Sequence, residues 1–135
     1  MSIKISVLAL LVLLTFSGSA QFKYRTINNE AFKTGEIIEY RIHYGFVDAG
    51  EARLEIKESF KEIGNRKSYH IVGLGTTKGA FDWFFKVRDR YETYLDFESL
   101  MPWVFIRRVD EGGYIINQNV TFNHQKKRQL LINLP

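Results

Sequence analysis

The stretch KVRDRYETYLD (Lys86–Asp96) decides the fold class, because the character of its side chains changes at every second residue. A period of two is typical of a β-strand that buries one face and leaves the other in water. One face carries Val87, Asp89, Tyr91, Thr93 and Leu95, and the other carries Arg88, Arg90, Glu92 and Tyr94. The stretch therefore predicts a half-buried strand whose apolar face must accommodate the charge of Asp89.

The same alternation recurs on both sides of this stretch. Further strands are expected at 36–46, 51–57, 68–76, 103–109, 114–122 and 129–134. Short polar or glycine-containing segments separate these strands as turns. Because no long segment has a helical period, the predicted fold class is mainly β, a single antiparallel meander forming a strongly curved sheet or a partial barrel. Two glycines inside one strand, Gly73 and Gly75, predict a bend or a close backbone approach.

The segment 77–85 does not fit this alternation, and we expect a short helix or an irregular aromatic segment there. Its aromatic residues are Phe81, Trp83, Phe84 and Phe85. A strand would divide these rings between two faces, whereas one helical turn would bring several to one side. The cluster then either packs over the sheet as core or stays partly exposed and binds an apolar group. It is the tentative ligand-binding site, with core packing as the simpler interpretation.

A second charge, Arg107, also lies on the apolar face of its predicted strand. A lone charge in such a place is costly. If the two strands pair about Glu98, the numbers of facing residues sum to 196, and Asp89 faces Arg107. We therefore predict a structural ion pair between Asp89 and Arg107.

The first 20 residues have the pattern of a secretory signal peptide. Lys4 is followed by an apolar run at 5–16 and by small residues at 17–20 that suit a signal-peptidase site. The run is shorter than the roughly 20 residues of a membrane span. We expect cleavage and no permanent membrane span, followed by a loosely ordered arm at 21–34 and an antiparallel β domain at 35–135.

The composition sets further bounds on structure and partners. The chain has 135 residues, no cysteine and a net charge of +4. This length suits one domain, and without disulfides an exported fold must be held by apolar burial. The charges are interspersed rather than clustered, which argues against a nucleic-acid partner.

The sequence holds no motif of a known chemistry. It has no P-loop, dinucleotide-binding glycine motif or serine-hydrolase elbow, so no cofactor is expected. The histidines His43, His70 and His124 lack metal-ligand spacing, although His43 and His70 could meet across a sheet beside Glu39 or Glu55. We favour solvent-facing strand histidines, expect no metal site, no catalytic residue and no enzyme activity, and keep an uncharacterised hydrolase as the third choice.

Three longer motifs carry a family resemblance: G-x-x-x-x-Y-x-I-x-Y-G at Gly35–Gly45, FDWFFKVRDRYE at Phe81–Glu92, and L-x-P-W-x-F-x-R-x-V-x-E-G-G-Y at Leu100–Tyr114. With them the chain resembles the exported bacterial family called domain of unknown function 3108, especially its Bacteroidetes-type members. The resemblance implies a mostly β, signal-bearing envelope protein without an established activity. Members are generally longer, so we expect a C-terminally shortened copy with an incomplete β domain.

Together these observations predict an exported protein in the periplasm or outer cell envelope of a Gram-negative bacterium. The leading hypothesis is that it binds an apolar or lipid-like ligand in a curved β-sheet, near Phe81 to Phe85. The alternative is a structural or protein-interaction module that acts through its sheet edges on an envelope protein.

Overall fold

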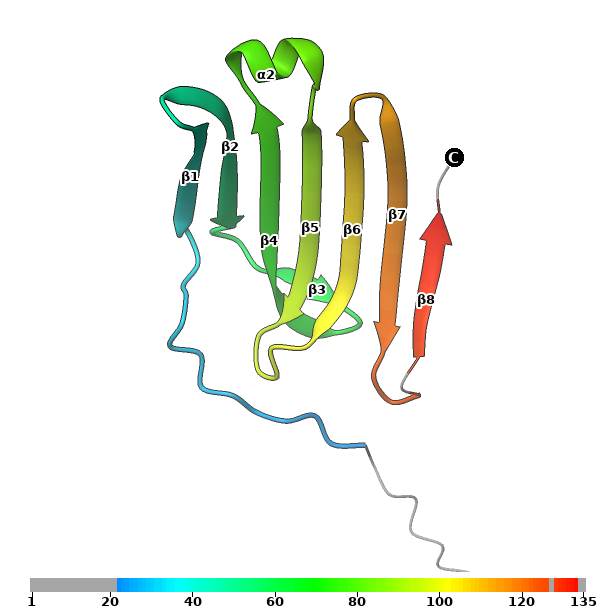
Figure 1. Ribbon diagram of the computed structural model, residues 1–135. Helices are drawn as coiled ribbons and strands as arrows, with labels where there is room; N and C mark the ends of the chain where they lie inside the picture. Colours follow the sequence, from blue (N-terminus) through cyan, green and yellow to red (C-terminus); the bar gives the residue numbers. More distant parts are fainter. Residues whose placement is uncertain (1–21, 127, 134–135) are drawn as a thin grey trace, which may run out of the picture.

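The computed structural model of the chain describes residues 22–126 and 128–133, and the expected signal peptide lies outside these residues. The described part contains strands and one short helix (Figure 1). They are β1 (Ile37–Tyr44), β2 (Val47–Ile56), β3 (Lys61–Ile63), β4 (Arg66–Thr77), α2 (Gly79–Phe84), β5 (Arg88–Asp96), β6 (Pro102–Glu111), β7 (Tyr114–Asn123) and β8 (Arg128–Asn133). The predicted strands and the predicted short helix are present.

The strands form one antiparallel sheet in the order β1-β2-β4-β5-β6-β7-β8. The short β3 pairs with the beginning of β4, whereas β2 pairs with its later part. The outer strands β1 and β8 do not pair with each other within the described residues, so the sheet stays open (Figure 1). The prediction of a mainly β antiparallel meander is confirmed.

The register gives the sheet an apolar face and a polar face. Leu54, Gly73, Tyr91 and Arg107 face one another across neighbouring strands, and directly facing residues lie on the same side of a sheet. The apolar face also carries Ile56, Ile71, Thr93, Phe105 and Val120. The polar face carries Arg53, Leu74, Arg90 and Arg108 in the row between them.

Aromatic rings pack together at the end of the sheet where β3 and the β5–β6 turn lie. The ring centroids of Phe32 and Tyr69 are 5.1 Å apart, and those of Phe60 and Phe97 are 5.3 Å apart, both edge to face. Tyr69, which also contacts Phe60 and Phe97, is buried. We call this the packed end, with members Phe32, Phe60, Tyr69, Asp96, Phe97, Ser99 and Trp103.

The carboxylate of Asp96 organises the packed end and is fully buried. It accepts hydrogen bonds from Arg66 Nη2 at 2.8 Å, from the backbone N–H of Ser99 at 2.7 Å and from Trp103 Nε1 at 3.0 Å. Burial by itself would raise the pKa of Asp96. The hydrogen bonds from Arg66 and Ser99 outweigh burial and hold this pKa well below its usual range.

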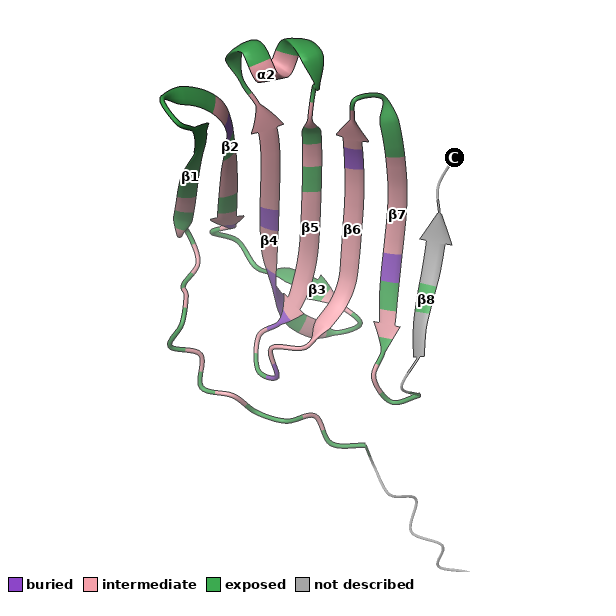
Figure 2. Cartoon of the chain, viewed as in Figure 1, coloured by how far each residue is buried: buried purple, intermediate pink, exposed green. Residues whose placement is uncertain are grey.

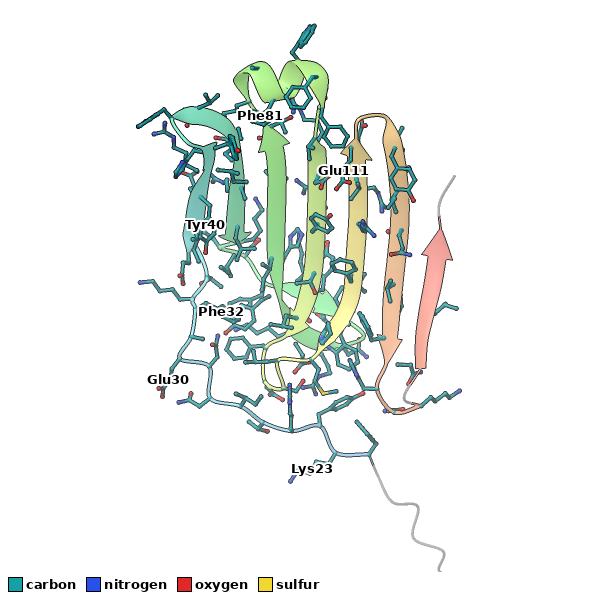
Figure 3. All side chains as sticks on the ribbon, viewed as in Figure 1. Lys23, Glu30, Phe32, Tyr40, Phe81 and Glu111 are labelled. Carbon is teal, nitrogen blue, oxygen red and sulfur yellow. The ribbon has the colours of Figure 1, made fainter. Side chains whose placement is uncertain are left out.

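The arm before β1 contains no helix or strand within residues 22–34, yet it is attached to the packed end. The backbone N–H of Ile27 donates to the carbonyl of Glu98 at 2.8 Å, and Arg25 Nε donates to the carbonyl of Ser99 at 2.9 Å. Figure 3 shows Phe32 of the arm beside the sheet, where it meets Tyr69. The arm therefore crosses one end of the sheet rather than covering its apolar face (Figure 1).

The predicted register between β5 and β6 is wrong by two residues. Tyr91 faces Arg107, so facing residue numbers sum to 198 rather than 196. One residue of the shift arises in the turn, where Asp96 accepts hydrogen bonds from both the backbone and the side chain of Ser99 and Leu95 faces Pro102. The other arises from a bulge between Tyr94 and Leu95, beyond which Tyr94 faces Val104. Asp89 and Arg107 thus lie diagonally on the same face, and no ion pair joins them among those of the described residues.

Candidate functional site

The apolar face contains a hollow of about 350 Å³. It lies where β1, β2, β4 and β5 run side by side (Figure 1). We call it the glycine hollow, and its lining is Tyr40, Ala52, Arg53, Leu54, Gly73, Leu74, Gly75, Asp89 and Tyr91. Its walls combine aliphatic and aromatic side chains with exposed glycine backbone, which is the usual composition of a site for an apolar ligand.

The hollow exists because two alternate residues of β4 have no side chain. Gly73 and Gly75 both face the apolar side, and neither has a positive φ. A Cβ at Gly73 would lie 3.8 Å from Leu54 Cδ1 and 3.9 Å from Tyr91 Cβ, and one at Gly75 would lie 3.7 Å from Asp89 Cβ. These are ordinary contact distances, so the expected close backbone approach at these glycines is wrong. What they provide is open space in the middle of an apolar face.

Two buried polar atoms beside the hollow have no hydrogen-bond partner among the described residues. They are Oδ1 of Asp89 and Nε of Arg107. The hydroxyl of Tyr91 donates to Oδ2 of Asp89 at 3.4 Å, and the guanidinium of Arg107 lies 6.0 Å from the centre of the Tyr91 ring. Tyr91 therefore contacts Asp89 and lies near Arg107, two opposite charges that form no ion pair with each other. Each of these buried atoms is expected to lower the stability of the fold, because it has lost its hydrogen bonds to water without gaining a partner.

The four aromatics predicted as the ligand site lie elsewhere. Phe81, Trp83 and Phe84 belong to α2, and Phe85 follows it, at the end of the sheet opposite the packed end (Figure 1). None of them lines the glycine hollow. Phe81 is half-buried, but α2 has no buried residue, and Trp83 is 90 % exposed. The helix expected here exists, but it does not plug the sheet as core, and its ligand-binding role stays a prediction.

The residues of the hollow were missed by sequence reasoning, which concentrated on the aromatic run. The signal that could have found them is the spacing of Gly73 and Gly75, because glycines two apart in a strand empty the same face. Asp89 was recognised as a charge on the apolar face. Its role as a polar wall of a hollow depends on the observed register and was not accessible from the sequence.

The polar face holds a half-buried pair, His70 and Glu92. His70 Nε2 lies 2.6 Å from Glu92 Oε2, and the His70 ring stacks on Tyr94 at 4.6 Å between centroids. Burial would raise the pKa of Glu92, but hydrogen bonds from Arg90 and His70 outweigh it and lower this pKa. The side chains of His70 and Glu92 therefore already have hydrogen-bonding or stacking partners in the structure.

His43 lies far from that pair. It faces Asp48 at the beginning of β2, whereas the carbonyl of His70 accepts a hydrogen bond from Lys57 after the end of β2. The cluster of His43 with His70 considered from the sequence therefore does not assemble. Within the described residues, no group of three His, Cys, Asp or Glu could hold a metal ion.

A second depression, of about 450 Å³, lies over the polar residues of β1 and β2. Its charged side chains satisfy one another. Arg53 pairs with Glu39 at 2.8 Å, and Arg41 pairs with Asp48. Because these charges already have partners, the glycine hollow is the stronger candidate for a ligand site.

The fold and the hollow together define a mainly β protein with an open antiparallel sheet and a hollow on its apolar face. Within the described residues, no helix has the length and apolar character needed to cross a membrane. Residues 39–132 match the model of the family described as "Protein of unknown function (DUF3108)", and the chain belongs to this family. No curated protein and no solved structure matches the chain.

Proposed function

We propose that the chain is a non-enzymatic, exported protein of the cell envelope that holds an apolar or lipid-like ligand in the glycine hollow. The observation that carries this proposal is the pair of glycines, Gly73 and Gly75, which leave space that contact distances would allow a side chain to fill. The volume of about 350 Å³ falls within the range of ligand sites, roughly 300–1,000 Å³. Export rests on the signal-peptide pattern of residues 1–20.

Asp89 and Arg107 add a polar requirement to the ligand. A group that donates to Oδ1 of Asp89 or accepts from Nε of Arg107 would remove the penalty of an unpartnered buried atom. An amphipathic molecule, with an acyl chain over the glycines and a polar head beside these charges, meets both conditions. A pure hydrocarbon meets only the apolar one.

The test is the lipid that co-purifies with the protein. The chain, exported to the periplasm of a bacterial host, is extracted with solvent, and lipid per mole of protein is measured by mass spectrometry. Gly73→Leu fills the hollow, whereas Gly73→Ala adds one Cβ at 3.8 Å and 3.9 Å from its neighbours and serves as the control. We expect lipid with the natural chain and with Gly73→Ala, and a loss of most of it with Gly73→Leu.

Two outcomes would contradict the proposal. Either no lipid accompanies the natural chain, or Gly73→Leu carries as much as Gly73→Ala while both give the same far-ultraviolet circular dichroism. The second outcome would place any bound lipid outside the hollow.

The exposure of the edge strand β1 supports a second candidate function. Among the described residues this strand pairs with β2 alone, and its residues Ile37, Tyr40, Ile42 and Tyr44 are all exposed. An unprotected edge of this kind can accept a strand from another molecule. If copies pair through β1, light scattering should show a dimer that Ile42→Lys dissociates. If light scattering shows a monomer at all concentrations, the hypothesis that copies pair through β1 is wrong.

A further inference from the structure

Large apolar side chains gather in solvent at the end of the sheet opposite the packed end. Trp83 is 90 % exposed, Tyr44 is 79 % exposed and Phe46 is fully exposed. They come from three separate segments: the β1–β2 turn, α2 with the residue after it, and the beginning of β7. We call this set the aromatic end, with members Tyr44, Phe46, Trp83, Phe84, Phe85, Tyr114 and Ile115.

The three segments are joined into one surface by backbone hydrogen bonds. The N–H of Lys78, just before α2, donates to the carbonyl of Ala49 in β2 at 2.9 Å. The N–H of Gly112, in the β6–β7 turn, donates to the carbonyl of Lys86 at 2.7 Å. Figure 1 shows α2 between the two turns at the same end of the sheet, and Figure 2 shows this end as largely exposed. These hydrogen bonds therefore keep the segments that carry the rings together at one end of the sheet.

Ion pairs lie in the same segments as these rings or close to them in the chain. Arg88 pairs with Asp82 at 2.7 Å, Lys78 pairs with Glu51, and Arg41 pairs with Asp48. Each pair places one positive and one negative group side by side. Because the two charges of each pair cancel, these groups give the aromatic end no excess of either sign, which suits a zwitterionic lipid surface better than a strongly charged partner.

The shape of the aromatic end distinguishes a membrane from a protein partner. Its rings project from turns and a short helix, and none of them lines either of the two hollows described above. A protein would need a matching set of pockets, whereas a lipid surface deforms around separate rings. Trp and Tyr are enriched at membrane–water interfaces because one part of the ring system is apolar and the other is polar.

We propose that the aromatic end is a membrane-contact surface, which inserts Trp83 and Phe84 into the interfacial region of a zwitterionic bilayer. The inference does not depend on the proposed ligand site, since no member of the aromatic end lines the glycine hollow. Insertion of a few aromatic side chains gives reversible attachment to a surface. The sheet would then stand with its aromatic end on the bilayer.

The experiment adds phosphatidylcholine vesicles to the whole chain and follows tryptophan emission. Trp83 is exposed, whereas Trp103 donates its indole N–H to Asp96 at the packed end, so a change on binding reports on Trp83. We expect a blue shift, quenching by brominated lipid, and partitioning measured by vesicle flotation. The Trp83→Ala/Phe84→Ala double variant should partition at least about tenfold more weakly.

The control is Leu130→Ser, which removes an exposed apolar side chain of β8 outside the aromatic end. It should bind vesicles like the natural chain, and so should Gly73→Leu, which separates this inference from the ligand site. Absence of flotation with the natural chain would overturn the proposal. So would equal flotation of the double variant, or self-association that the double variant abolishes without any vesicle binding.

Discussion

At one end of the sheet the buried ring of Tyr69 packs against the rings of Phe32 and Phe60, while at the other end Trp83 is exposed to solvent. Both ends are rich in aromatic residues and both contain ion pairs. The difference is that the packed end has a buried polar centre, Asp96, which joins Arg66 at the beginning of β4 to Ser99 in the β5–β6 turn and to Trp103 in β6. At the aromatic end the ion pairs described above contain no fully buried group.

This difference indicates that the two ends serve different purposes. The chain can bury aromatic rings, as the packed end demonstrates, so the exposure of α2 does not reflect a general inability to form a core. We therefore expect substitutions at the packed end to act on stability. Substitutions at the aromatic end, and substitutions that fill the glycine hollow, should act mainly on binding.

The largest expected effect comes from Asp96→Ala. The change leaves Arg66 and Trp103 Nε1 without their buried acceptor, and breaking a buried pair from one side typically costs about 3–5 kcal/mol. Urea unfolding followed by circular dichroism measures the free energy of unfolding. The control, Asp82→Ala, removes the half-buried partner of the exposed Arg88 at the aromatic end and should change stability far less. Equal losses of unfolding free energy in the two variants would contradict the claim that the packed end contributes more to stability than the aromatic end.

The dependence of stability on pH should have the same origin. The pKa of Asp96 is lowered by folding, so its contribution is complete above its unfolded pKa of about 3.9 and is lost as the pH falls below that value. Unfolding free energies between pH 3 and pH 7 should therefore fall on the acid side, by at most about 1.4 kcal/mol per pH unit for this group. Asp96→Asn should flatten that fall, and an unchanged acid profile in this variant would contradict the assignment.

A smaller effect on stability, of opposite sign, is expected for a substitution in the glycine hollow, which lies between the two ends of the sheet. Gly73→Ala should stabilise the chain by about 0.5–1 kcal/mol, because a strand glycine loses more backbone freedom on folding than alanine does. The control is Gly50→Ala, whose Cβ would lie 2.5 Å from the carbonyl oxygen of Thr76 and should destabilise the chain. If Gly73→Ala also destabilised it, the space over Gly73 would not be open.

The smallest effect on stability is expected from Trp83→Ala. The side chain is 90 % exposed, and surface changes away from special contacts usually fall within about 0.5 kcal/mol. Thermal and urea unfolding should therefore overlay with those of the natural chain. A loss as large as that of Asp96→Ala would mean that the aromatic end is also part of the core.

The sequence predicted the elements well, because the period of two in β5 and its neighbours is a local property. It also located α2, where the alternation fails. It could not give the register between β5 and β6, because this depends on how Asp96 hydrogen-bonds to Ser99 within the turn and on a bulge between Tyr94 and Leu95. The hollow was missed for a related reason. Gly73 and Gly75 indicate a bend, a close approach or open space, and only the facing residues decide among these.

The most direct test of the account is amide NMR of the isotope-labelled chain during titration with dodecylphosphocholine below its micelle concentration. If an amphipathic ligand enters the glycine hollow, the largest shifts should fall on the amides of Gly73, Gly75 and Tyr91. Those of the packed end should stay unchanged. Shifts confined to the edge strands β1 and β8, with none at the two glycines, would contradict the central claim that the hollow is the binding site.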